Sequence, residues 1–216
     1  SSQTTAVTLA NGLVQTSVYD KAGDLISYAE SGSGVTTATT SYLYDKLGRL
    51  RAVTDPTGQT NHVFYDGDGR KVADVDGDGS VTEYRYDAAG RVTSTTGYAA
   101  RLTGTQLASI LSGGALTDIA FSMLRPAASS DDRWNWAYYD LAGRAVRTLD
   151  GPGAVTVLAY DGASQLVSTT ELATRMSSTE IAGLKAVAAP PNLWANPNDG
   201  TQWTLSNTTR TANGQI

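Results

Sequence analysis

The chain has 216 residues, no cysteine, one histidine and a formal net charge of −5 at pH 7. The lack of cysteine excludes disulfides, thiolate nucleophiles and zinc–thiolate sites, and the acidic balance argues against a nucleic-acid-binding face. No apolar run approaches the roughly 20 residues that cross a bilayer, and no signal peptide is visible.

A Tyr-Asp pair recurs six times along the chain, five times with Gly three residues after the Asp. The tyrosines stand at 19, 44, 65, 86, 139 and 160, so the steps are 25, 21, 21, 53 and 21 residues. A period near 21 is too short for a domain and indicates an array of supersecondary units. The motif residues are Tyr19, Asp20, Gly23, Tyr44, Asp45, Gly48, Arg49, Tyr65, Asp66, Gly69, Arg70, Tyr86, Asp87, Gly90, Arg91, Tyr139, Asp140, Gly143, Arg144, Tyr160 and Asp161.

Each motif predicts a tight hairpin turn. Asp at the first position accepts a hydrogen bond from the backbone two residues on, and Gly at the fourth position supplies a positive φ. The flanking segments, such as 80–86 and 91–96, alternate in polarity and are rich in Val, Thr and Tyr, which favours strands. A second turn signal lies seven residues before three of the tyrosines, at Gly58, Gly79 and Gly153. The predicted fold class is mainly β, with antiparallel hairpins forming a winding continuous sheet.

A longer offset of 74 residues predicts short helical inserts in this sheet. It aligns residues 100–108 with 174–182. Both segments carry a capping box before an apolar run, Thr103 with Gln106 and Ser177 with Glu180.

We therefore expect helices near 104–111 and 178–187, and a third near 117–125 that Thr117 caps. Regular repeats should occupy about 13–98 and 134–170, and helical or loop inserts about 99–133 and 171–205. All of these lie within a single array over 1–216.

These motifs resemble the YD repeats of the bacterial Rhs family, which also occur in shell-forming subunits of insecticidal toxin complexes and in teneurins. The resemblance runs from about Tyr19 to Leu166. It implies a hollow β-shell that encloses a toxic C-terminal segment, or an extracellular barrel used in adhesion. The function we expect is a structural segment of such a shell, without catalysis of its own.

The same resemblance implies the surroundings of the chain. Its partners would be the rest of a larger Rhs-like protein and the enclosed cargo, and it would be secreted or displayed at the cell surface as part of that exported protein. Because the chain starts at Ser1 without a methionine and ends inside a degenerate repeat, we expect a fragment. Its exposed sheet edges predict self-association.

The alternative function is an extracellular adhesive module. Trp134, Trp136, Trp194 and Trp203 all stand outside the regular repeats. The rings of Trp134, Trp136 and Trp203 would then contact a glycan or a protein partner. Large aromatics also fasten inserts to a sheet, and we favour that packing interpretation. The repeat tyrosines are likewise interpreted as a stacked ladder of cross-strand contacts rather than a ligand platform.

No cofactor is expected, and calcium is a weaker alternative. Asp74, Asp76 and Asp78 alternate as in the first half of a calcium loop, but the twelfth position holds Arg85 where a bidentate Glu is needed. No catalytic residue is assigned, because the lone His62 fits a structural strand position and the aspartates have turns to make. A polysaccharide-cleaving enzyme that uses paired carboxylates such as Asp131 and Asp132 ranks third.

Overall fold

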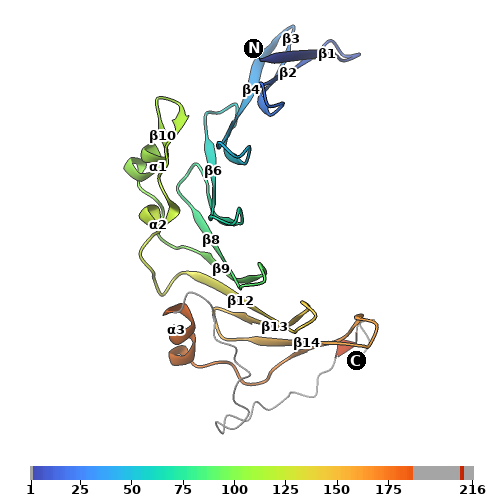
Figure 1. Ribbon diagram of the computed structural model, residues 1–216, viewed down its shortest axis with the longest axis vertical. Helices are drawn as coiled ribbons and strands as arrows, with labels where there is room; N and C mark the ends of the chain where they lie inside the picture. Colours follow the sequence, from blue (N-terminus) through green and yellow to red (C-terminus); the bar gives the residue numbers. More distant parts are fainter. Residues whose placement is uncertain (1, 187–209, 212–216) are drawn as a thin grey trace. The chain divides into compact units, whose positions relative to one another are not determined.

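The computed structural model describes residues 2–186 and 210–211, and short strands joined by tight turns make up most of them (Figure 1). The strands of five to ten residues are β1 (Gln3–Thr8), β2 (Val14–Tyr19), β3 (Leu25–Gly32), β4 (Val35–Tyr44), β5 (Leu50–Thr54), β6 (Thr60–Tyr65), β7 (Lys71–Val75), β8 (Val81–Tyr86), β9 (Val92–Gly97), β12 (Arg133–Tyr139), β13 (Ala145–Asp150), β14 (Val155–Tyr160) and β15 (Leu166–Glu171). The two-residue strands are β10 (Leu111–Ser112), β11 (Ala115–Leu116) and β16 (Arg210–Thr211), and the helices are α1 (Gly104–Ile110), α2 (Phe121–Leu124) and α3 (Ser178–Ala186).

The strand order of the main sheet follows the chain from β1 to β9 and then from β12 to β16, while β10 and β11 form a separate hairpin. The strand pairs with a defined register are antiparallel. The predicted fold class, antiparallel hairpins in a mainly β fold with short helices, is confirmed. The chain divides into two compact units, residues 1–82 with 100–128 and residues 83–99 with 129–216, and the division falls within β8.

Every Tyr-Asp hairpin with a defined register carries a one-residue β-bulge just after its turn. In the hairpin of β4 and β5, Leu43 pairs with Ala52 but Tyr44 pairs with Leu50, so Arg51 is the extra residue. The same shift occurs at Tyr19, Tyr65, Tyr139 and Tyr160. A bulge increases the local twist of its strand, so the twist recurs with the sequence motif.

In the first unit, one face of strands β5 to β7 is buried, and residues 100–128, which we call the first insert, lie beside it (Figure 1). Ala52 pairs with His62, and His62 pairs with Val75, so the three share this face. All three are buried, as is Phe64, whose ring centroid lies 5.8 Å from that of Phe121 in α2. The first insert thus supplies the cover that a single sheet layer lacks.

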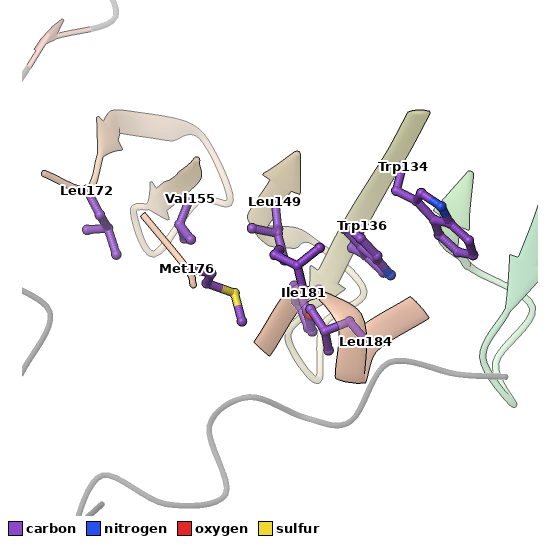
Figure 2. Packing of buried hydrophobic residues seen from close by; sticks show 9 residues of the cluster. Trp134, Trp136, Leu149, Val155, Leu172, Met176, Ile181 and Leu184 are labelled. Carbon is purple, nitrogen blue, oxygen red and sulfur yellow. The ribbon is translucent and has the colours of Figure 1, made fainter. Parts of the chain in front are cut away.

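The second unit has an equivalent core, formed by strands β12 to β14 and α3 (Figure 2). Trp134, Trp136 and Leu149 lie in it, together with Ile181 and Leu184 of α3. We call the segment 172–186 the second insert. The large aromatic side chains bury apolar surface against a short helix, and this burial stabilises a fold that has only one sheet layer.

Two of the three predicted helices are confirmed, together with their capping boxes. The Thr103 Oγ1 accepts a hydrogen bond from the Gln106 backbone N–H at 3.3 Å, and the Gln106 Oε1 accepts one from the Thr103 N–H at 3.0 Å. Ser177 and Glu180 form the same pair before α3, at 3.3 and 2.8 Å. These reciprocal bonds satisfy backbone donors that a helix start leaves free.

The third helix is shorter than predicted, and its predicted cap is wrong. The helix α2 covers only Phe121–Leu124 and has no side-chain cap. Thr117 instead closes the β10–β11 hairpin, because its Oγ1 donates to the Ser109 carbonyl at 2.8 Å. Gly113 and Gly114 have φ of 58° and 82° and allow this tight reversal, which the sequence interpretation missed.

Both inserts begin with the same contact to a turn glycine. The Leu102 N–H donates to the Gly79 carbonyl at 2.8 Å, and the Met176 N–H donates to the Gly153 carbonyl at 2.9 Å. Leu102 and Met176 are 74 residues apart, as are Gly79 and Gly153, so the longer period of the sequence is a structural period. The insert backbone leaves no room for a side chain at these turns.

Replacing Gly79 with Ala should therefore destabilise the chain much more than the matched change Gly58→Ala. Both glycines have positive φ, +85° and +87°. A Cβ at Gly79 would lie 2.5 Å from the Leu102 carbonyl oxygen, whereas a Cβ at Gly58 would meet nothing within 4 Å. We expect Gly58→Ala to cost about 1 kcal/mol, and Gly79→Ala at least about 2 kcal/mol more, in urea unfolding. Equal losses would contradict the docking contact.

Candidate functional site: the repeat turn and its contacts

The repeat turn has the hydrogen bonds that its sequence predicts. At Asp87, the side-chain Oδ1 accepts from the backbone N–H groups of Ala89 and Arg91, both at 2.9 Å. The Gly90 N–H donates to the Asp87 carbonyl at 3.0 Å, and Gly90 has a φ of 79°. Left-handed φ values are also found at Gly23, Gly48, Gly69 and Gly143. In the sixth copy, which lacks its Gly, Ser164 adopts a φ of 63°.

The arginine that follows the glycine folds back onto the turn aspartate. The Arg91 Nε donates to the Asp87 Oδ2 at 2.7 Å, and its Nη2 lies 2.6 Å from the same oxygen. The backbone N–H of Arg91, and then its guanidinium, hold the pKa of Asp87 below its usual value. Equivalent ion pairs join Arg49 to Asp45, Arg70 to Asp66 and Arg144 to Asp140.

The same arginine also contacts the tyrosine of the next repeat. The Arg91 Cζ lies 4.7 Å from the ring centroid of Tyr139, and its Nη1 donates to the Asp140 carbonyl at 3.0 Å. In return, the Tyr139 hydroxyl donates to the Val92 carbonyl at 2.7 Å. We call this reciprocal pair of contacts the Arg–Tyr clasp. A cation over an aromatic ring contributes about 0.5 to 2 kcal/mol, depending on how far it is desolvated.

The Arg–Tyr clasp recurs in both units. Arg49 lies 4.7 Å over the ring of Tyr65, whose hydroxyl donates to the Leu50 carbonyl at 3.1 Å. Arg144 lies 4.8 Å over the ring of Tyr160, whose hydroxyl donates to the Ala145 carbonyl at 2.8 Å. In each of the three clasps, the arginine of one repeat lies over the tyrosine ring of the next repeat. The sequence included the arginine in the motif but did not indicate this contact.

The clasp between Arg91 and Tyr139 explains the 53-residue step in the tyrosine series. Strand β9 pairs directly with β12, with Ser94 opposite Trp136, although the first insert separates them in the chain. The repeats of Tyr86 and Tyr139 are therefore consecutive. The insert is an addition to a connection and leaves the repeat contacts unchanged.

The first repeat departs from this pattern. Asp24 takes the place of the arginine after Gly23, while the Tyr44 hydroxyl still donates to the Leu25 carbonyl at 3.0 Å. Burial, and then the negative charge of Asp24, raise the pKa of Tyr44. The contact between these two repeats thus keeps its hydrogen bond but has a carboxylate where the others have a guanidinium.

The structure places Trp134 and Trp136 inside the second core. Their rings stack with centroids 5.5 Å apart, and only 3% and 2% of the two residues is exposed. They belong to the same buried cluster as Ile181 and Leu184, and Figure 2 shows the Trp136 ring near these α3 side chains. This arrangement favours the packing interpretation over a glycan contact at these two positions. Trp194 and Trp203 lie outside the described residues.

Two of the three aspartates considered for calcium have other partners. Asp74 forms an ion pair with Lys71 at 2.7 Å, and Asp78 forms one with Arg101. Within residues 2–186 and 210–211, no three or more His, Cys, Asp or Glu side chains are grouped to hold a metal ion. Calcium binding rests on the sequence pattern alone and stays a prediction. None of the helices in this part of the chain is both long and apolar enough to cross a membrane.

The turn, the ion pair and the clasp define a repeat protein of antiparallel hairpins joined by recurring side-chain contacts. Two segments, residues 19–60 and 65–102, match the model of the RHS Repeat family, so these two segments are RHS repeats. The repeats of Tyr139 and Tyr160 lie beyond these segments and have the same turn and clasp geometry.

Among solved structures, the chain is similar to those titled "Crystal Structure of TcdB2-TccC3-Cdc42" and "Crystal Structure of TcdB2-TccC3". The first is 16% identical, with 79% of this chain and 11% of that chain covered and a TM-score of 0.39. The second is 16% identical, with 76% and 12% covered and a TM-score of 0.28. This chain thus spans about a tenth of the length of those chains. No curated protein matches it.

Completing the clasp in the first repeat should stabilise the chain. In Asp24→Arg, the new guanidinium should pair with Asp20 and lie over the ring of Tyr44, as in the other repeats. We expect a gain of about 1 kcal/mol in the free energy of unfolding, measured with urea. Lys21→Arg, in the same turn, is the matched control and should be neutral. A loss of stability in Asp24→Arg would show that the clasp geometry does not extend to this repeat.

Proposed function

We propose that this chain is a wall segment of an Rhs-type shell that encloses a toxic segment of a larger exported protein and performs no catalysis itself. The observation that carries the proposal is the Arg–Tyr clasp, because it joins three pairs of consecutive hairpins by the same contacts, one of them across the first insert. A sheet that is extended in this way has few free edges along its length, which suits a wall.

The distribution of side chains supports a structural role. Each turn carboxylate accepts a hydrogen bond from the backbone N–H of a residue two or four positions later in the same turn, at Asp45, Asp66, Asp87, Asp140 and Asp161. Such carboxylates are committed to local structure and are poorly placed for acid–base chemistry. The inserts cover apolar sheet faces, which stabilises a layer only one sheet thick.

Electron microscopy of the intact parent protein tests this proposal. A tag inserted between Gly113 and Gly114, at the tip of the β10–β11 hairpin, marks the segment at an exposed turn of the first insert. We expect a closed hollow particle with the tag in its wall. An open, extended array would contradict the shell and favour the adhesive module. The untagged parent controls for damage by the insertion.

Enclosure is tested on the same sample by limited proteolysis. The enclosed segment of the parent protein should resist a protease in the native particle. The same protease should digest it after denaturation. Rapid digestion of this segment in the native particle would contradict enclosure, even if electron microscopy shows a closed wall.

A further inference from the structure

The single histidine of the chain lies in the core of the first unit. His62 is on β6 and is only 4% exposed. Its register partners are Ala52 and Val75, so it stands in an apolar row across three strands. It points to the same face as Phe64, two residues on, whose ring contacts Phe121 of the first insert. The imidazole is thus buried on the face of the sheet on which Phe64 meets the first insert.

The surroundings of His62 do not favour an imidazolium ion. Its Nδ1 is buried and has no hydrogen-bond partner in the part of the chain that the structure describes. On β5, the Arg51 guanidinium lies over the Phe64 ring at 5.0 Å and brings a positive charge to the same core. Burial, and then the charge of Arg51, lower the pKa of His62.

The other charged groups of the neighbouring elements are engaged elsewhere. On β7, Lys71 and Asp74 pair with each other, and Asp74 stands opposite Val63, on the other face from His62. On the first insert, Asp118 interacts with Arg51, and Arg125 lies over the Phe121 ring. None of these contacts neutralises a positive charge on the His62 ring.

The second unit supplies an internal comparison. The 74-residue offset aligns His62 with Trp136, Val75 with Leu149, and Ile110 with Leu184, and all six residues are buried. The two inserts therefore pack on equivalent positions, but only the first packs on a residue that titrates near neutral pH.

We propose that His62 is an acid-sensitive latch, so that its protonation opens the packing between the first insert and strands β5 to β7. The open form exposes the ring to water, where it binds a proton with its ordinary affinity, whereas the closed form resists protonation. The closed packing is thus fully stable above about pH 6.5 and weakens as the pH falls below that value. Carboxylates titrate mainly below pH 5, so the range from 7.5 to 5 isolates the histidine.

Hydrogen exchange at pH 7.5 and pH 5.0, corrected for the intrinsic exchange rate, tests the latch. Amides of α1 and α2 should lose protection by up to about thirtyfold, the limit when the closed ring stays neutral down to pH 5. Amides of α3, which packs on Trp136, are the matched control and should keep their protection. In His62→Gln, which cannot titrate, α1 and α2 should keep theirs as well.

The latch would be overturned by an equal loss of amide protection in His62→Gln or in α3. It would also be overturned if the unchanged chain lost no protection in α1 and α2. If His62→Gln does not fold, His62→Phe provides the same comparison with an aromatic ring, as at Trp136. The single histidine also gives one titrating ring resonance in NMR spectra. A midpoint at or above pH 6.5 in the folded chain would overturn the proposal without any substitution.

Discussion

The contact between an arginine of one repeat and the tyrosine of the next is the interaction on which the rest of the structure depends. A two-stranded hairpin is marginally stable by itself, so each repeat must gain stability from its neighbours. The clasp combines an ion pair within one turn, a cation over a ring and a hydroxyl bonded to a backbone carbonyl. Arg91, for example, is held by Asp87 and covers Tyr139. Strands β9 and β12 remain paired although 35 residues, 98–132, separate them in the chain.

The inserts address a different constraint, since a single sheet layer exposes an apolar face. Each insert is fixed at its start by a backbone contact to a turn glycine and then buries a few large side chains. The two copies share this geometry but differ at the centre of the buried row, where His62 corresponds to Trp136. One scaffold thus carries two cores of different chemistry, and the proposed acid sensitivity would belong to only one of them.

Much of the fold is predictable from the sequence because its determinants are local. The aspartate and glycine of each turn, and the capping boxes at Thr103 and Ser177, act within four residues. The strand bulges, the clasp and the β10–β11 hairpin were missed. The bulge recurs after the same turn motif and could have been inferred from it. A clasp joins residues as far apart as Arg91 and Tyr139, so it has no local signature. Thr117 resembled a helix cap because its partner, the Ser109 carbonyl, comes within hydrogen-bond distance only when the β10–β11 hairpin has formed.

A double-mutant cycle on Arg91 and Tyr139 tests the central role of the clasp most directly. Urea unfolding of Arg91→Gln, Tyr139→Leu and the double variant gives the coupling energy between the two side chains. We predict a coupling of about 1 kcal/mol, while Arg175→Gln combined with Tyr139→Leu should be additive within about 0.5 kcal/mol. Additive losses for Arg91 and Tyr139 would contradict the account, because the repeats would then be joined by their backbone ladder alone.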